Sequence, residues 1–274
     1  MSEMRRLLEI MARLRDPEGG CPWDRQQTFA SILPYTLEEA YEVAEAIDSG
    51  DMAALRAELG DLLFQVVFYA QLAKEAGEFA FGDIVASICD KLERRHPHVF
   101  GDAPLGSSEE HRLAWEAMKQ QERAAKASAQ QRPESVLDDV PQALPGLVRA
   151  VKLQRRAARV GFDWAAVDDV LAKIEEELAE VRHELANGSD HGRLTHEVGD
   201  VLFACSNLAR CTGVDAEVAM RGVNERFERR FRRIEALLAL EGRTPSQATL
   251  EEMDRLWEQA KAEEVEPLND ERKA

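Results

Sequence analysis

The chain has 274 residues, of which 45% are hydrophobic, so it can form one or two folded domains and is not disordered throughout. Its formal net charge of -17 repels phosphodiester backbones, which argues against a nucleic-acid-binding protein. Long stretches rich in Ala, Leu, Glu, Arg and Gln, with only 6% aromatic residues, predict an all-α fold.

The sequence also argues against a membrane or secreted protein. No run reaches the roughly 18 consecutive apolar residues of a membrane-spanning helix. Residues 1–15 form an amphipathic stretch that lacks the apolar core of a signal peptide. The four cysteines have no C-x-x-C spacing, which favours free thiols over a zinc site or a disulfide framework. We therefore expect a cytoplasmic protein.

The first helices of the chain lead to an acidic region. We expect one helix to end near Arg15. Thr36 and Glu39 have the spacing of a capping box, which predicts a second helix from Leu37 to about Ile47. The next helix carries the motif Glu58-Leu-Gly-Asp61 and then becomes apolar almost all round, which indicates burial on every side.

Two more helices complete the first half. One is expected from Phe81 to about Arg95, and another from a cap at Ser107 through Trp115 and Lys119. Residues 124–140 begin with small and polar residues that show no hydrophobic period, and we interpret the segment as a linker. The expected domains are residues 1–123 and 141–274.

The second half repeats the plan of the first. The acidic segment Glu38-Glu39-Ala-Tyr-Glu42 recurs as Glu176-Glu177-Leu-Ala-Glu180, at an offset of 138 residues. The motif Glu58-Leu-Gly-Asp61 recurs as Glu197-Val-Gly-Asp200, at an offset of 139. Such small drift over half a chain indicates a duplication.

Each half supplies four carboxylates that point to a metal site. The i, i+3 spacing places each pair on one helical face, and a short turn folds the next helix back against it. Four converging carboxylates would repel one another, and Mg²⁺ or Mn²⁺ would resolve the repulsion. The expected ligands are Glu39, Glu42, Glu58 and Asp61 in the first half and Glu177, Glu180, Glu197 and Asp200 in the second.

An alternative explanation exists for a single pair. An E-x-x-E pattern is common on any solvated acidic helix, and Glu39 is also explained as the capping-box partner of Thr36. Three residues before Glu177, however, stands Ile174, so capping does not explain Glu177. The doubled pattern with matched spacing favours the metal sites.

Cations and aromatic residues follow the carboxylates in both halves. Arg and Lys are the usual partners of phosphate oxygens, and a Trp and a Lys at i, i+4 share one helical face, which suits a nucleotide. The alternative is a Trp that anchors a terminal helix beside a Lys whose stem lies along it. The candidates are Lys91, Arg95, Trp115 and Lys119 in the first half, and Lys173, Arg226, Arg230, Trp257 and Lys261 in the second.

Three negative observations narrow the chemistry. No G-x-x-x-x-G-K-[ST] motif is present, so phosphate is not held by a P-loop. The segment His96-Pro-His98 indicates a helix end rather than a metal site. A di-iron site needs E-x-x-H on two corresponding helices, and Glu180-Val-Arg-His183 has only Glu42-Val-Ala-Glu45 as its counterpart.

Four segments together resemble the MazG family of nucleoside triphosphate pyrophosphohydrolases, and the resemblance covers nearly the whole chain. They are Gly20-Cys-Pro-Trp-Asp24, Tyr35-Thr-Leu-Glu-Glu-Ala-Tyr-Glu42, Glu58-Leu-Gly-Asp-Leu-Leu-Phe-Gln65 and Lys91-Leu-Glu-Arg-Arg-His-Pro-His98. The resemblance implies tandem four-helix-bundle-like domains in an intertwined homodimer. It also implies Mg²⁺-dependent hydrolysis of NTPs and dNTPs to the monophosphate and pyrophosphate, with broad base specificity and a role in cleaning nucleotide pools.

The resemblance also assigns roles to residues of the second half. It implies that Glu177, Glu180, Glu197 and Asp200 bind the metal, and that Arg226, Arg230, Trp257 and Lys261 contact the nucleotide. It further implies that Glu176 would act as a base or orient a ligand. The family tends to have Lys where this chain has Arg226. Two alternatives stay open: a narrower dUTP or dCTP hydrolase, and a non-catalytic helical regulator.

Overall fold

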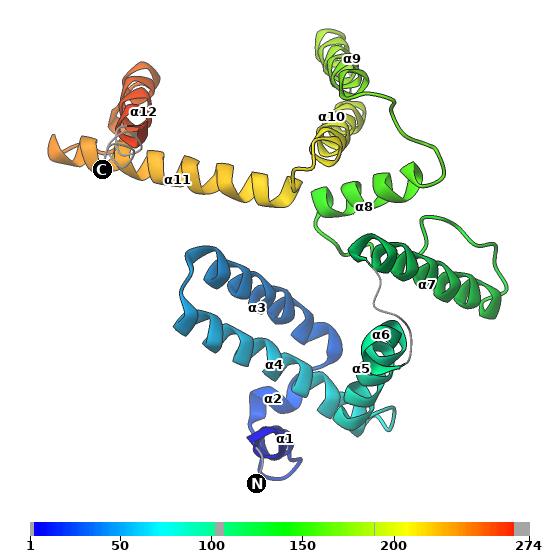
Figure 1. The fold of residues 1–274 in the computed structure, drawn as a ribbon. Coiled ribbons are helices and arrows are strands. Elements are labelled where there is room, and N and C mark those ends of the chain that lie inside the picture. The colour runs from blue at the N-terminus through cyan, green and yellow to red at the C-terminus, as the bar shows by residue number, and fades with distance from the viewer. Residues whose placement is uncertain (1–2, 102–106, 189, 266–274) are drawn as a thin grey trace, which may run out of the picture. The chain divides into compact units, whose positions relative to one another are not determined.

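The computed structural model describes residues 3–101, 107–188 and 190–265, and it divides into two compact units, Met1–Gln121 and Glu122–Ala274. Every regular element among the described residues is a helix, which confirms the all-α prediction (Figure 1). None of the described helices has the length and apolarity needed to cross a membrane. All four cysteines are free thiols.

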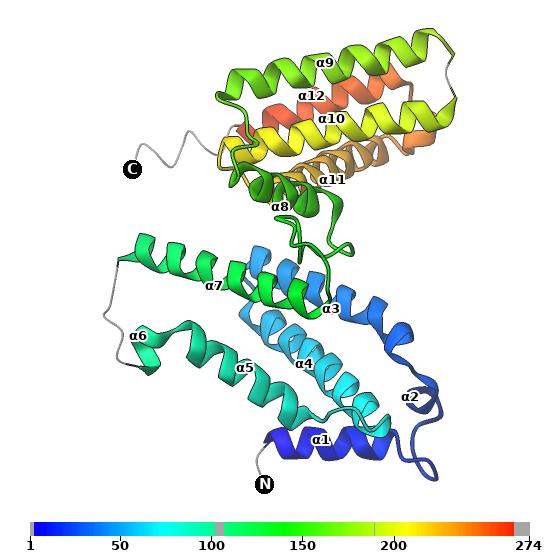
Figure 2. The same ribbon diagram turned by 90° about the vertical axis from the view of Figure 1, so that its right-hand side faces the viewer.

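The first unit is built around an antiparallel helix pair, α3 (Phe29–Ser49) and α4 (Met52–Glu75) (Figure 2). Gly50, with φ of 71°, ends α3 in the left-handed conformation that favours glycine. The Asp51 carboxylate then accepts hydrogen bonds from the N–H groups of Ala53 and Ala54 and begins α4. The turn places the acidic segments of the two helices face to face.

Other helices precede and follow the pair in the chain. They are α1 (Glu3–Leu14), α2 (Pro22–Gln26), α5 (Phe81–Arg95), α6 (Pro97–Phe100) and α7 (Ser108–Ala129). Helix α1 packs on α4, and the core between α1, α3 and α4 consists of Met11, Ile32, Val67, Phe68 and Leu72. The predicted ends of α1 and α5 are confirmed.

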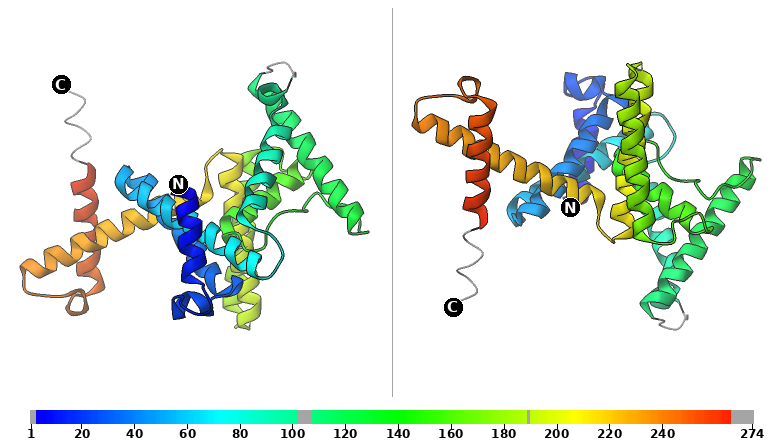
Figure 3. Two further views of the ribbon diagram at one scale, coloured as in Figure 1. Left: turned by 90° about the horizontal axis from the view of Figure 1, so that it is seen from below. Right: turned by 90° about the horizontal axis from the view of Figure 1, so that it is seen from above.

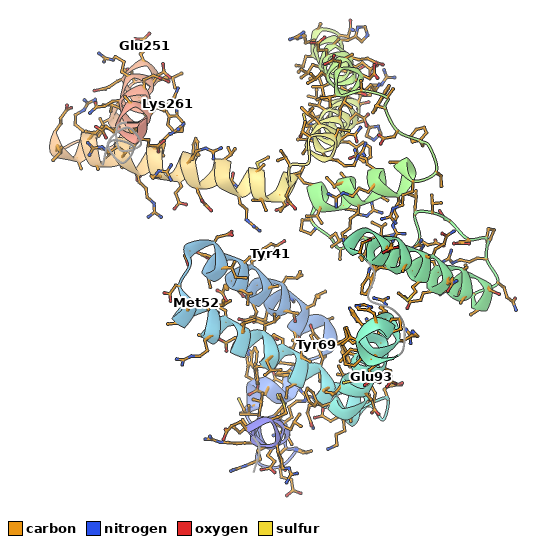
Figure 4. All side chains as sticks on the ribbon, in the orientation of Figure 1. Tyr41, Met52, Tyr69, Glu93, Glu251 and Lys261 are labelled. Carbon is orange, nitrogen blue, oxygen red and sulfur yellow. The ribbon has the colours of Figure 1, made fainter. Side chains whose placement is uncertain are left out.

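The predicted start of α3 is wrong. The helix begins at Phe29, with Thr28 as N-cap and Ser31 completing the capping box, and it continues through Pro34. Thr36 is not a cap, because its hydroxyl bonds the carbonyl of Ile32 at 3.3 Å and the hydroxyl of Tyr69 on α4 at 2.9 Å (Figure 4). Capping of a helix by Thr36 therefore does not explain Glu39.

Two further expectations for this region need correction. Helix α4 is not buried on every side, because Leu63 and Val66 are each 36% exposed. The stretch expected to begin the linker at residue 124 is still helical, since α7 continues to Ala129. Ala and Lys, which fill this stretch, are strong helix formers, and their propensity prevails over the absence of an apolar period. The cap of α7 at Ser107 is confirmed by its hydrogen bond from the Glu110 N–H.

The second unit contains a matching pair, α9 (Val167–Ala186) and α10 (His191–Cys211), with α8 (Gly146–Ala158) packed on α10. Helix α11 (Ala216–Leu240) follows, then a 3₁₀ turn (Pro245–Gln247) and α12 (Leu250–Val265). Helix α12 lies against α11 and crosses it (Figure 3). The predicted Thr249 cap of α12 is confirmed by the bond from the Glu252 N–H to the Thr249 hydroxyl.

Candidate metal and nucleotide site

The second unit brings three of its four predicted metal ligands together. Glu177 lies on α9, and Glu197 and Asp200 lie one turn apart on α10. One carboxylate oxygen from each lies within 4.8 Å of the others. Glu177 is 6% exposed, so its charge needs compensation from a nearby cation.

The fourth predicted ligand, Glu180, lies beside this cluster. A hydrogen bond between the carboxyl groups of Glu180 and Glu197 raises the pKa of Glu180, and burial and the charge of Glu177 raise it further. A divalent cation bound among these carboxylates would relieve the repulsion that raises this pKa. The all-oxygen donor set fits Mg²⁺.

The first unit contains the corresponding cluster, but a different trio of carboxylates lies closest together. Glu39, Glu42 and Glu58 have oxygens within 4.8 Å of one another. The pKa of Glu39 is raised, first by burial and then by the charges of Asp61 and Glu42. Asp61 is thus close to Glu39 but outside the trio. The donor set of this unit also fits Mg²⁺.

Lys173 distinguishes the two clusters. Its ammonium group lies 2.8 Å from a Glu177 oxygen and 3.0 Å from a Glu176 oxygen, and both contacts raise the pKa of Lys173. At the offset of 138 residues, the first half has Tyr35 in its place, which packs edge-on against Trp23. A lysine therefore compensates the acidic cluster of the second unit, and the first unit has no lysine at this position.

The predicted nucleotide residues of α11 and α12 form a separate group. The Arg230 guanidinium lies over the ring of Trp257, 5.5 Å from its centroid, and donates to Glu264 at 2.8 Å. Lys261 lies on α12 (Figure 4), and its ammonium group donates to Glu258 at 2.9 Å. The contacts described for these side chains are with residues of α11 and α12. Arg226 is exposed on α11, one turn before Arg230.

The first unit shows the same grouping of cations around a tryptophan. The Arg95 guanidinium lies 4.7 Å and the Lys119 ammonium 5.4 Å from the centroid of Trp115. Lys91 is exposed on α5. The His96 ring packs on Trp115 and its Nδ1 lies 2.7 Å from the Leu92 carbonyl oxygen, so His96 caps the end of α5, as predicted.

A cavity beside the second acidic cluster was not predicted. It has a volume of about 530 Å³, and Lys173, Glu177 and Asp200 line part of its wall. The other walls come from α8, α10 and residues 161–164, and they are mostly apolar. A position-by-position comparison of the two halves would have pointed to it. At the offset of 139 residues, Asn207 and Ala204 stand where the first half has Phe68 and Gln65.

Comparison with known proteins agrees with this architecture. The model of the MazG nucleotide pyrophosphohydrolase domain matches residues 27–100 and 166–234, one stretch in each unit. The "Nucleoside triphosphate pyrophosphohydrolase" of Escherichia coli (strain K12) is 53% identical over 267 residues, which cover 97% of this chain and 100% of that protein.

Two further matches come from Thermotoga maritima. Its "Nucleoside triphosphate pyrophosphohydrolase/pyrophosphatase MazG" is 42% identical over 93% of this chain and 94% of that protein. The crystal structure of a mazG-related protein matches 42% of this chain and 97% of its own at 31% identity, with a TM-score of 0.37. With two family domains in tandem and full-length relatives at 53% and 42% identity, this chain belongs to the MazG nucleotide pyrophosphohydrolase family.

Proposed function

We propose that this chain is a Mg²⁺-dependent nucleoside triphosphate pyrophosphohydrolase, for which Mn²⁺ can substitute. It hydrolyses NTPs and dNTPs to the monophosphate and pyrophosphate, accepts several bases and serves to clean nucleotide pools. The observation that carries the proposal is the convergence of Glu177, Glu197 and Asp200 within 4.8 Å in a member of this family.

The chemistry follows from the charges in the second unit. Mg²⁺ held by Glu177, Glu180, Glu197 and Asp200 would neutralise the triphosphate and stabilise the pyrophosphate leaving group. Water adds to a phosphorus of the α–β linkage, and the bond between that phosphorus and the bridging oxygen breaks. Glu176, held by Lys173 at 3.0 Å, orients the water or accepts its proton.

Lys173 has a second task in this proposal. Its ammonium group pairs with Glu177 and lies beside the proposed metal ligands, where it could also bind a phosphate oxygen of the substrate. The first-half counterparts of the metal ligands, Glu39, Glu42, Glu58 and Asp61, would hold Mg²⁺ in the same way.

We further propose that Arg226, Arg230, Trp257 and Lys261 contact the nucleotide in an intertwined homodimer. In such a dimer α11 and α12 of one copy would reach the acidic cluster of the other. Exposed apolar residues on α11, among them Val218, Val223 and Phe227, support a partner helix on that surface. Lys91, Arg95, Trp115 and Lys119 would play the corresponding part in the first half.

The proposed setting is the cytoplasm, with nucleoside triphosphates and a second copy of the chain as partners and no nucleic acid or membrane. Four free thiols fit a reducing compartment. The net charge of -17 disfavours binding to phosphodiester backbones.

A matched pair of substitutions tests which carboxylates serve the reaction. We expect Glu180→Gln to weaken Mg²⁺ activation of pyrophosphate release by at least about tenfold, because even indirect partners of metal ligands contribute this much to metal affinity. Glu42→Gln makes the same change at the corresponding position of the first half. Pyrophosphate is measured with all eight common NTPs and dNTPs as the Mg²⁺ concentration is varied.

The two variants separate the possible results. Loss of activity in Glu180→Gln alone assigns the reaction to the second unit, and similar losses in both assign it to both units. Unchanged Mg²⁺ dependence in both variants would contradict the proposed metal sites. A wild-type protein that releases pyrophosphate from only one substrate would replace the broad enzyme with a narrow one.

A further inference from the structure

We propose that the 530 Å³ cavity of the second unit binds the nucleobase of the substrate and sets base preference. This inference rests on the proposed hydrolysis of nucleoside triphosphates. It assigns the base to residues of α8, α10 and the α8–α9 loop (residues 159–166) rather than to Trp257.

The first argument is the continuity of the cavity with the acidic cluster. Glu177 and Asp200 belong to the proposed metal site and also line the cavity. The base and the α-phosphate of a nucleotide are joined through a single sugar, so a base pocket must adjoin the place where the phosphates bind. The cavity meets this requirement because Glu177 and Asp200 form part of its wall.

The second argument is the shape and polarity of the walls. Leu153, Val170 and Phe203 form apolar walls, and Phe162 and Trp164 add flat aromatic rings. These two rings are 81% and 48% exposed in the chain, so both retain apolar surface that a ligand can cover. Ligand pockets of this size are typically apolar, with a few polar groups that fix orientation.

The third argument is a buried amide without a full set of partners. Gln154 on α8 is 9% exposed, and its Nε2 donates to the carbonyl oxygen of Phe203 at 2.8 Å. Its Oε1 is buried and has no hydrogen-bond partner. An unpaired buried acceptor is costly, and an amino or imino N–H on the edge of a base would satisfy it.

The loop that carries the aromatic rings is held in place from α10. Arg210 donates to Asp163 Oδ2 at 3.1 Å and, through Nη2, also to Oδ1. The same guanidinium donates from Nε to Asn207 Oδ1 at 2.8 Å. Arg210 thus fixes both Asn207, which lines the cavity, and the loop residue between Phe162 and Trp164.

The first unit shows what happens when the same space is filled. Phe68, at the position of Asn207, is fully buried in the core with Met11 and Leu72. Gln65 occupies the position of Ala204. Both side chains are larger than their counterparts in the second unit, so we expect them to fill the space that corresponds to the cavity. Base preference therefore belongs to the second unit, although both units carry acidic clusters.

The test removes the amide and then narrows the cavity. Gln154→Leu keeps the approximate side-chain volume but removes both amide groups, and Ala204→Leu narrows the cavity without changing a described hydrogen bond. Gln65→Leu is the matched control, because it removes a buried amide with an unpartnered Oε1 from the first unit. For each full-length variant, kcat/KM is measured for the four common dNTPs, and equilibrium dialysis gives the affinities of the four dNMPs.

We expect Gln154→Leu to change the ratio of kcat/KM between the best and worst dNTP by about tenfold. Ala204→Leu should weaken dNMP binding, most strongly for the purines because they are larger. Gln65→Leu should leave the ratios and dNMP affinities at their wild-type values. Circular dichroism and thermal unfolding establish that each variant is folded.

Several results would overturn the inference. One is unchanged ratios and dNMP affinities in folded Gln154→Leu and Ala204→Leu proteins. Another is a shift of base preference in Trp257→Ala that neither cavity variant produces. A third is a change of oligomeric mass in the cavity variants without a change in base preference, which would show that a second copy fills the cavity. A wild-type protein that hydrolyses no triphosphate would instead contradict the proposed function, and dNMP binding would still report on the cavity.

Discussion

Glu177 illustrates how a single residue combines structural and chemical demands. Its carboxylate is buried on α9 and lies near two other carboxylates, so its charge needs compensation. Lys173, one helical turn earlier, supplies the compensating charge at 2.8 Å. Buried ion pairs are costly to break from one side, because the remaining charge is left without a partner. Lys173 therefore compensates a carboxylate that would otherwise be buried without a partner.

Replacing this lysine should reveal that role. We expect Lys173→Met to lower the free energy of unfolding by about 1–3 kcal/mol when EDTA is present, the usual cost of leaving a buried hydrogen-bonding group without its partner. Saturating Mg²⁺ should recover part of the loss, because the metal replaces the missing cation. Urea denaturation with and without Mg²⁺ measures both effects.

Lys261→Met provides the matched control for stability. Its ammonium bonds Glu258, which is exposed, and exposed pairs contribute little, so the change should stay within about 0.5 kcal/mol. Equal destabilisation by the two substitutions would show that Lys173 has no special role in compensating Glu177.

At the scale of elements, charged pairs connect α12 to α11. Glu264 accepts hydrogen bonds from Arg230 and Arg229, and Glu263 accepts from Arg233. The Arg230 guanidinium is thereby kept over Trp257. An arginine that is proposed to meet phosphate is thus already oriented by a carboxylate on the neighbouring helix.

These contacts predict how the helix pair responds to acid. The bonds from Arg230 and then Arg229 lower the pKa of Glu264 to about 2 from its ordinary 4.5. The stabilisation from a carboxylate with a lowered pKa is present above 4.5 and is lost as the pH falls from about 4.5 towards 2. We expect tryptophan fluorescence to report loosening of α12 in this interval.

Substitution assigns that acid response. Glu264→Gln should loosen α12 already at pH 7 and reduce the change seen between pH 4.5 and 2. Glu258→Gln, which alters an exposed partner of Lys261 on the same helix, is the control and should retain the wild-type acid profile. An unchanged profile in Glu264→Gln would exclude Glu264 as the source of the transition.

Local signals in the sequence predicted some helix ends and not others. The caps at Ser107 and Thr249 depend on residues three positions apart, so they could be read directly. The start of α3 was missed because Ser31, rather than Glu or Gln, completes the capping box of Thr28. Pro34 lies inside this helix, five residues after its first residue, Phe29.

The candidate site was predictable to the extent that it depends on sequence spacing. The i, i+3 spacing and the duplicated motifs singled out the carboxylates, three of which lie within 4.8 Å of one another in each unit. Spacing alone did not separate the Trp257 group from the carboxylates, because that separation depends on where α12 packs. Nor did it reveal the cavity, which arises from the small volumes of Ala204 and Asn207.

At the scale of the whole molecule, the chain leaves long apolar stripes exposed. On α9, Leu171, Leu178 and Leu185 recur every seven residues and are 42%, 39% and 62% exposed. Leucines at this spacing are typical of a seam between helices. On α3, Leu33 and Ile47 are exposed at the positions that match the first and last of these leucines. The stripes favour the proposed association of two copies.

A charge in the middle of the stripe should prevent that association. We expect wild-type protein to have the mass of a dimer and Leu178→Glu to shift it at least partly to the monomer, because a desolvated carboxylate opposes burial of the seam. Light scattering coupled to size-exclusion chromatography gives the masses. Leu250→Glu is the control, since Leu250 is 79% exposed but lies on α12, outside the stripe. Identical masses for all three proteins would contradict a seam on α9.

The cavity beside Glu177 also affects the stability of the second unit relative to the first. Empty volume forfeits dispersion contacts that Phe68 retains in the first unit, so the second unit is the more weakly packed copy at this position. A ligand that fills the cavity adds its binding free energy to that of folding. Nucleotides bound in the cavity would then stabilise the second unit against unfolding, so its stability would depend partly on its own substrates. The first unit, in which Phe68 occupies the corresponding position, would not need this stabilisation.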